Sequence, residues 1–184
     1  KAYQDHRICL INSFRAKLVH KKSLFAILTH EKNKSLFNAA EHKVIRQHIP
    51  WTRRVEKTKT RYKGKSIDLL DFIAKHKDDL VIKPNDEYGG TGVTLGWEMP
   101  ADKWEQTITN ALDDFYVVQE RVPIPHEKFP YYQDGLRFAD LIVDLDPYVF
   151  GPEIGGVLTR LSAGALANVT TGGGATSTFV LTER

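Results

Sequence analysis

The sequence predicts an α+β protein with mostly antiparallel sheets, and three observations indicate this fold class. Up to residue 122, segments with helical spacing of apolar residues alternate with short apolar runs that are typical of strands. From Gly135 onward the helical spacing disappears, and glycine turns separate the apolar runs. The chain has 184 residues, 41% hydrophobic and 27% charged, and is therefore long and apolar enough to form a core.

Residues 1–65 predict one strand, two helices and a polar stretch. The apolar run at residues 6–12 has the character of a short buried strand, in which Cys9 reads as a small buried hydrophobe. Asn38 is followed three residues later by Glu41, a spacing that predicts a capped helix start. In chain order, the expected elements are a strand at 6–12, helices at 21–31 and 38–48, and a loop or edge strand at 50–65.

Residues 66–122 predict two helices and three strands. Ser66 is expected to cap the first helix, whose apolar side carries Ile67 and Ile73. In the second helix Trp104 and Ile108 stand at i and i+4, which places them on one face. The expected helices cover residues 66–79 and 101–114, and the expected strands cover 80–84, 92–98 and 115–122.

Residues 123–184 predict a loop followed by strands. Residues 123–135 contain three prolines and therefore read as a surface loop. Beyond them, the sequence predicts strands at 136–150, 154–162 and 175–181.

Charge is unevenly distributed along the chain. Residues 1–65 contain 17 Lys or Arg and 4 Asp or Glu, whereas residues 66–184 contain 9 and 19. A basic segment attracts phosphate, whether on a nucleic acid or on a nucleotide. The alternative is that these lysines form a solvated face or pair with the acidic part of the chain.

Cysteine content and hydropathy bear on the compartment. The single cysteine excludes an internal disulfide framework, no apolar run approaches the ~20 residues of a membrane span, and no signal peptide opens the chain. We therefore expect a cytoplasmic protein without a membrane partner. The first residue is Lys1 rather than Met, and we expect a further segment upstream of it.

A lysine followed by a glycine-rich turn is the first motif that indicates function. Lys83 ends the predicted strand at 80–84, and Gly89, Gly90 and Gly92 follow it. Glycines allow backbone N–H groups to approach phosphate oxygens closely. The motif is neither a Walker A loop nor a Rossmann turn, since a strand and not a helix follows the glycines. It predicts a flap folded over a nucleotide; the alternative is a tight hairpin with a surface lysine.

Two later stretches carry further polar residues. The strand at 115–122 ends in Gln119 and Glu120, where its backbone could bond an adenine and the carboxylate could bind ribose hydroxyls. Arg160 is a cation in an otherwise apolar strand, and Asn168 precedes three consecutive glycines by four residues. Such glycines suggest a second close approach to an anion, or to a reacting carbonyl whose developing charge needs N–H donors, or else a flexible turn.

Together these motifs resemble the ATP-grasp superfamily, in particular its circularly permuted branch, which includes glutathionylspermidine-synthase-like carboxylate–amine ligases. The resemblance spans nearly the whole chain. Its motifs are INSFRAKLVHKKSLFAIL, KPNDEYGGTGV, DLDPYVF, GGVLTR and NVTTGGG with the following TFVL.

The resemblance implies two lobes that hold ATP between mostly antiparallel sheets. The family activates a carboxylate as an acyl phosphate with ATP and Mg²⁺, and an amine then displaces phosphate; small-molecule or peptide carboxylates and amines would be the substrates. The implied divisions are a basic segment at 1–65 on the phosphate and metal side, a nucleotide-binding lobe at 66–122 and a catalytic antiparallel sheet at 123–184.

The resemblance also implies roles for individual residues. For phosphoryl transfer these are Arg160, Asn168 and Lys22. For the nucleotide they are Lys83 on the phosphates, Gly89, Gly90 and Gly92 as the flap, Gln119 to Val122 as the adenine hinge, and Glu120 on the ribose. For the metal they are Asn12, Asp144 and Glu153.

The metal ligands depart from the family pattern. No glutamate stands two residues before Asn12, and the nearest carboxylates in the predicted catalytic sheet are Asp144, Asp146 and Glu153. Asp144 and Asp146 could equally form a solvated strand end, and the true ligands could lie upstream of Lys1. A non-catalytic nucleotide-binding module and a basic nucleic-acid-binding domain at residues 1–65 are therefore kept as alternatives, although we expect small substrates rather than nucleic acid as partners.

Overall fold

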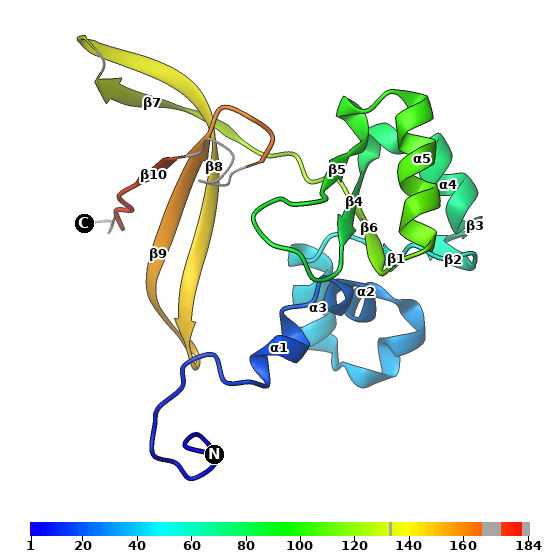
Figure 1. The fold of residues 1–184 in the computed structure, drawn as a ribbon, viewed down its shortest axis with the longest axis horizontal. Coiled ribbons are helices and arrows are strands. Elements are labelled where there is room, and N and C mark those ends of the chain that lie inside the picture. The colour runs from blue at the N-terminus through cyan, green and yellow to red at the C-terminus, as the bar shows by residue number, and fades with distance from the viewer. Residues whose placement is uncertain (133, 167–173, 182–184) are drawn as a thin grey trace. The chain divides into compact units, whose positions relative to one another are not determined.

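The computed structural model describes residues 1–132, 134–166 and 174–181 and divides the chain into two compact units. The first unit contains Lys1–Glu87 and Gly92–Arg121, and the second contains Tyr88–Thr91 and Val122–Arg184. Both units are built from antiparallel strand pairs, and the helices lie in the first (Figure 1). The predicted α+β class with antiparallel sheets is confirmed.

The main sheet of the first unit has the strand order β1-β6-β4-β5. Its strands are β1 (Thr52–Arg54), β4 (Leu80–Pro84), β5 (Thr94–Leu95) and β6 (Tyr116–Glu120). Since β1 pairs with β6, residues 1–65 are not a separate unit. The predicted strands at 80–84 and 115–122 are confirmed, and the strand after the glycines is shorter than predicted.

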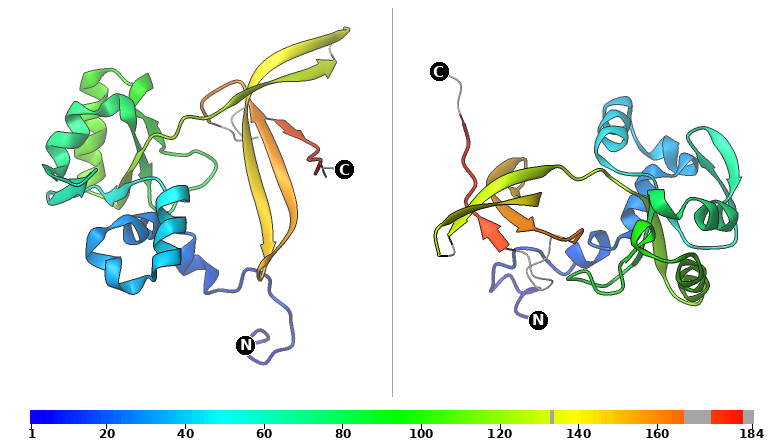
Figure 2. Two further views of the ribbon diagram at one scale, coloured as in Figure 1. Left: turned by 180° about the vertical axis from the view of Figure 1, so that it is seen from behind. Right: turned by 90° about the horizontal axis from the view of Figure 1, so that it is seen from above.

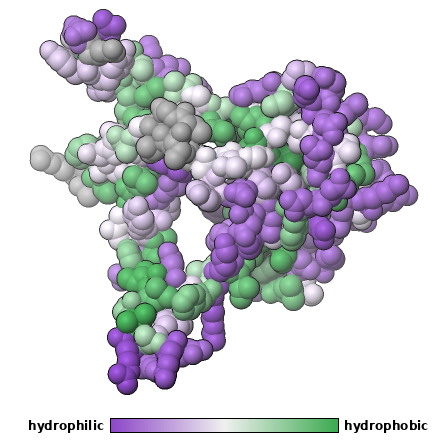
Figure 3. Space-filling model, in the orientation of Figure 1, coloured by the Kyte–Doolittle hydropathy of each residue, from purple (hydrophilic) through white to green (hydrophobic). Residues whose placement is uncertain are grey.

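Two helices cover one face of this sheet. They are α4 (Leu69–Lys75) and α5 (Ala101–Leu112), and their outward sides are hydrophilic (Figure 3). The indole N–H of Trp104 donates to the carbonyl of Ile73 at 2.9 Å, which joins the two helices and satisfies a buried donor. The buried cluster consists of Val55, Leu69, Ile73, Leu80, Ile82, Trp104, Ile108, Ala111 and Val118.

Four short helices precede β1. They are α1 (Ala16–Val19), α2 (Ser23–Thr29), the 3₁₀ helix η1 (Glu31–Leu36) and α3 (Ala39–His48). The predicted cap of α3 is confirmed, since Asn38 Oδ1 accepts from the Glu41 N–H at 3.0 Å and Glu41 Oε2 accepts from the Asn38 N–H at 2.8 Å. None of the helices in the described part of the chain combines the length and apolar character that a membrane crossing requires.

Two predictions about the first unit are wrong. Residues 6–12 form no strand, and Cys9 is exposed, as is Ile11 at 71%. An apolar run forms a strand only where another strand pairs with it. Ser66 does not cap a helix, because it pairs with Arg61 in a hairpin, and Asp68 caps α4 instead.

The reason for the second error lies in a hairpin turn. Strands β2 (Lys59–Tyr62) and β3 (Lys65–Asp68) pair around Lys63 and Gly64, whose φ values are 47° and 82°. Two consecutive positive φ values are typical of a type I′ hairpin turn. Residues 65–68 are therefore used in a strand pair before the helix begins. Two further 3₁₀ turns, η2 (Lys77–Asp79) and η3 (Gly96–Glu98), flank β4 and β5.

The second unit is a sheet in the order β10-β9-β8-β7. Its strands are β7 (His126–Tyr132), β8 (Leu136–Phe150), β9 (Glu153–Ser162) and β10 (Gly174–Thr176), and β8 runs beside β9 as a long hairpin (Figure 2). The predicted loop at 123–135 is therefore wrong. Pro130 is tolerated because β7 is at the edge of the sheet, where a missing N–H leaves no strand unpaired.

Candidate functional site

The candidate site of the first unit lies on the face of the main sheet that faces away from α4 and α5. In the pairing of β4 with β6, Val81 is opposite Gln119 and Lys83 is opposite Val117. Directly opposed residues and alternate residues along a strand share a face. Lys83 and Gln119 therefore share one face, whereas the core residue Ile82 points to the other.

A chain of hydrogen bonds orients the Lys83 side chain. Its ammonium donates to Gln119 Oε1 at 2.7 Å, and Gln119 Nε2 donates to Thr52 Oγ1 at 2.9 Å. The single hydroxyl hydrogen of Thr52 is directed to the Pro50 carbonyl at 2.9 Å, so Thr52 accepts from the amide. This fixes the direction of the Gln119 amide, and its oxygen faces Lys83.

Electrostatics at Lys83 disfavour its charged form. Burial lowers the pKa of the Lys83 ammonium, and the nearby charge of Lys22 lowers it further. An anion bound beside the ammonium would offset both effects, because it favours the charged form. A half-buried cation next to a second cation is therefore a candidate anion-binding group.

Lys22 reaches the same region from the start of α2. Its Nζ donates to the Glu87 carbonyl at 2.6 Å. The Ser23 N–H donates to Asn85 Oδ1 at 2.9 Å and the Lys22 N–H to the Asn85 carbonyl at 3.2 Å, although Ser23 and Asn85 are 62 residues apart. Burial lowers the pKa of Lys22, while the charges of Asp86 and Glu87 oppose this effect.

Three further basic side chains surround Asp86. Lys17 Nζ and His20 Nε2 lie 3.0 Å and 2.8 Å from Asp86 Oδ1, and Lys21 Nζ forms an ion pair with Oδ2. Hydrogen bonds from Lys21, Lys17 and His20 hold the pKa of this carboxyl well below its usual range. We define the basic cluster as Lys17, His20, Lys21, Lys22 and Lys83. Sequence reasoning identified only Lys22 and Lys83 among these.

The backbone conformation after β4 accounts for the three glycines there. Gly89, Gly90 and Gly92 have φ values of 63°, 82° and 69°, a region that favours glycine. A Cβ on Gly92 would also lie 3.1 Å from Pro84 Cγ. The loop from β4 to β5 thus requires glycine at these positions whatever it binds, and the flap role remains a prediction.

The hinge residues are divided between the two faces of the sheet. Glu120 follows Gln119 in the strand and therefore points to the opposite face. Its Oε1 accepts from the Tyr62 hydroxyl at 2.6 Å and forms an ion pair with Lys63 at 3.0 Å. The structure does not bring the Glu120 carboxylate to the face that carries Lys83. Val122 is 53% exposed and begins the second stretch of the other unit.

Arg160 in the second unit has carboxylate partners. It is opposite Asp144 in the β8–β9 pairing and forms an ion pair with it, and its Nε lies 2.9 Å from Asp146 Oδ2. The carboxylates predicted as metal ligands thus bind the cation predicted to bind phosphate. Glu153 is exposed and pairs with Phe150. Phe150 is six residues after Asp144 on β8, so the rise of a strand places Glu153 roughly 20 Å from Asp144.

The remaining predicted residues do not assemble into a metal site. Asn12 is exposed, with φ 59°, before α1. Asn168 and two of the three glycines after it lie outside the described residues. Within the described ranges, no three His, Cys, Asp or Glu side chains are grouped so that they could hold a metal ion. The described carboxylates therefore do not fit the predicted Mg²⁺ site.

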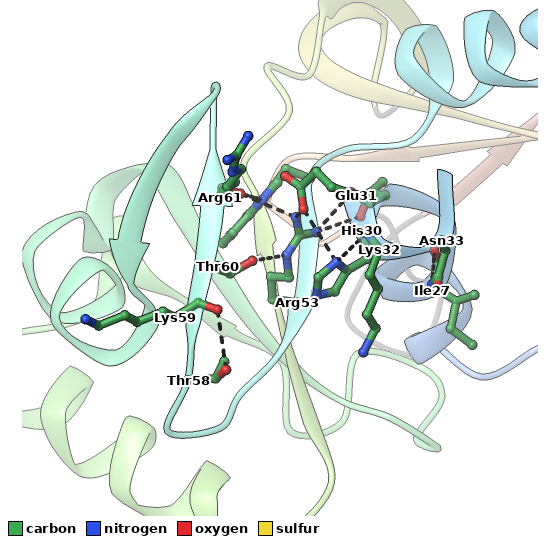
Figure 4. A network of polar contacts seen from close by, with 12 residues as sticks. Ile27, His30, Glu31, Lys32, Asn33, Arg53, Thr58, Lys59, Thr60 and Arg61 are labelled. Atoms are coloured by element: carbon green, nitrogen blue, oxygen red, sulfur yellow. Dashed lines mark hydrogen bonds and ion pairs between the residues drawn. The ribbon is translucent and has the colours of Figure 1, made fainter. Parts of the chain in front are cut away.

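A buried arginine that sequence reasoning missed supports the site (Figure 4). Arg53 Nε donates to Thr60 Oγ1 at 2.7 Å, and its Nη2 pairs with Glu31 at 3.0 Å. Burial lowers the pKa of Arg53, and Glu31 opposes this effect. Its Nη1 donates to the Thr52 carbonyl at 2.7 Å, so it also holds the strand on which the hydrogen-bond chain of Lys83 ends. The guanidinium carbon of Arg53 lies 4.9 Å from the centroid of the Trp51 ring. A tryptophan near an arginine in the sequence was thus the one local feature that could have indicated this buried cation.

Comparison with protein-family models and with curated proteins finds no match for this chain.

Proposed function

We propose that the first unit binds the phosphate groups of a nucleotide through the basic cluster. The observation that carries this proposal is the position of Lys83: half-buried, beside Lys22, oriented by Gln119 and followed by a glycine loop. Its ammonium bonds a neutral amide there, so a bound anion would add a charge-assisted hydrogen bond. Phosphate is the anion that a cluster of lysines suits best.

We further propose that the nucleotide is ATP and that the chain takes part in a carboxylate–amine ligase reaction. This part rests on the motif resemblance and includes the ATP-grasp-like fold. A substrate carboxylate oxygen would attack the γ-phosphorus and release ADP; an amine would then attack the acyl carbon and release phosphate, forming a C–N bond. Lys83 and Lys22 would stabilise the negative charge that gathers on the phosphate oxygens during transfer.

A second candidate function is nucleotide binding without catalysis. Asp144 and Asp146 both bind Arg160, and the described residues contain no group of carboxylates that fits Mg²⁺. We therefore assign no step of the reaction to a metal held by these residues.

Calorimetric titration with ATP tests the binding proposal. Wild-type protein is expected to bind ATP, and Lys83→Ala to lose at least about tenfold in affinity, the equivalent of one charge-assisted hydrogen bond. Lys103→Ala, which removes one positive charge from the exposed side of α5, is the matched control and should bind as wild type. Equal affinity of Lys83→Ala and Lys103→Ala would refute the assignment.

Turnover separates the two candidates once binding is established. ADP release that depends on both an added carboxylate and an added amine supports the ligase, and binding without ADP release supports the non-catalytic module. Salt-sensitive binding of an oligonucleotide that ATP does not displace would instead favour a nucleic-acid-binding role for residues 1–65.

A further inference from the structure

Asp86 is held by more positive charge than one carboxylate can neutralise. His20 contributes Nδ1, 2.8 Å from the Lys17 carbonyl, and Nε2, 2.8 Å from Asp86 Oδ1. The ammonium groups of Lys17 and Lys21 bind the same carboxylate, and Lys17 Nζ also lies 3.2 Å from His20 Nε2. Two lysine cations and an imidazole therefore converge on one carboxylate.

The geometry around Asp86 matches what an anion receptor requires. Lys17 and His20 bind Oδ1, and Lys21 binds Oδ2, so donors approach both oxygens of one group. A phosphate group presents three oxygens and up to two negative charges. It would thus satisfy the same donors and neutralise more of their charge than Asp86 does.

Asp86 lies in the same chain segment as Lys83, and its partners lie in the segment of Lys22. Asp86 is three residues after Lys83, at the start of the β4–β5 loop, and its charge opposes the lowering of the Lys22 pKa by burial. The contacts with Lys17, His20 and Lys21 connect this loop to the segment before α2, 65 or more residues earlier in the chain.

We propose that Lys17, His20 and Lys21 form a phosphate-binding subsite that Asp86 occupies in the free protein and that an oligophosphate ligand takes over by displacing the Asp86 side chain. Asp86 is then an internal competitor, which lowers the affinity for phosphate. This inference rests on the proposed function, since it extends the phosphate site of Lys83 and Lys22.

Inorganic tripolyphosphate is the probe, because it carries the phosphate chain without a base or sugar. Asp86→Asn removes the competing charge and keeps the side-chain size, and we expect it to bind tripolyphosphate about tenfold more tightly than wild type by calorimetric titration. Asp86→Glu keeps the competitor and should stay within about twofold of wild type. Glu105→Gln on the exposed side of α5 makes the same change in net charge away from the cluster. Its affinity for tripolyphosphate should also stay within about twofold of wild type.

Lys21→Gln offers an independent test should Asp86→Asn fail to fold, as thermal melts by circular dichroism would show. It removes one donor of the subsite and should weaken tripolyphosphate binding about threefold relative to the matched Lys103→Gln. In the double variant, Lys21→Gln should cancel much of the gain in tripolyphosphate affinity that Asp86→Asn produces. Equal affinity of Lys21→Gln and Lys103→Gln overturns the subsite.

The outcomes separate this inference from the proposed function. If wild type binds ATP in a Lys83-dependent manner but Asp86→Asn binds tripolyphosphate no tighter than Glu105→Gln, the subsite is wrong and the nucleotide site stands. If neither wild type nor Asp86→Asn binds ATP or tripolyphosphate, both proposals fail.

Discussion

The two units each place a cation on an antiparallel strand, but they give it opposite surroundings. In the first unit, Lys83 donates to the neutral Gln119 amide and has Lys22 as a nearby charge. In the second, Arg160 is bound by Asp144 and Asp146. A strand cation opposite carboxylates has its charge neutralised within the sheet, whereas one oriented by an amide keeps its charge for a ligand.

The two units also differ in how far they bury their apolar side chains. The first unit buries Trp104, Ile108 and seven other cluster residues between helices and sheet. In the second, β8 exposes large apolar side chains such as Leu145 and Val149 at 58% each. Because packed helices hold the sheet of the first unit, its polar face can be arranged without the ion pairs that join β8 to β9.

Removal of Arg160 should have the largest effect on stability. Arg160→Met leaves Asp144 and Asp146 on one strand face without their shared cation, and we expect a loss of about 1–2 kcal/mol in the free energy of unfolding, less than for a fully buried pair because the carboxylates are partly exposed. Urea unfolding followed by circular dichroism measures it. The triple variant Arg160→Met, Asp144→Asn, Asp146→Asn should recover most of the loss; no recovery would mean that Arg160 acts through packing alone.

Gln119→Glu would give Lys83 the kind of partner that Arg160 has. The new carboxylate should pair with the ammonium and reduce tripolyphosphate affinity about tenfold in calorimetric titration. Gln106→Glu, the same charge change on the exposed side of α5, is the control. If the two variants bind equally, the neutral partner of Lys83 has no role in anion binding.

The pH dependence of stability gives the smallest and most specific effect. Burial and Lys22 lower the pKa of Lys83 in the folded protein below 10.5, so in the interval between the two values the unfolded chain binds more protons. The free energy of unfolding contributed by Lys83 therefore rises as pH increases through that interval. Lys83→Met should flatten this rise, and Lys103→Met should not. If the free energy of unfolding of Lys83→Met rises with pH below 10.5 as steeply as that of the wild type, the lowered pKa of Lys83 is contradicted.

Much of the fold of the first unit was predictable because its signals are local. The capping box of α3 and the apolar spacing of α5 depend on residues a few positions apart, and both helices form where predicted. The errors at residues 6–12 and 126–132 concern strands, whose formation depends on a partner elsewhere in the chain. The apolar run at 6–12 pairs with no strand among the residues that the structure describes, whereas the proline-containing 126–132 pairs with β8.

The candidate site was predictable only in part. Lys83 was identifiable because it is a cation at the end of an apolar run, before glycines. Thr52 and Asp86 gave no such signal, because their roles come from contacts with residues 65 or more positions away. Arg160 stood out as an isolated cation in its own strand, although the neighbouring strand supplies its carboxylates.

By itself, the sequence determined the helices α3 and α5, the central strands β4 and β6, and the lysine of β4 with three glycines after it, because periodicity, capping and φ preferences act over a few residues. Tertiary structure alone decided which charges meet. The pairing of β4 with β6 places an amide beside Lys83, the contact of α2 with Asn85 brings the basic cluster to the same loop, and the pairing of β8 with β9 places carboxylates beside Arg160. Electrostatic energies depend on distances in space, and strand register and helix packing set those distances.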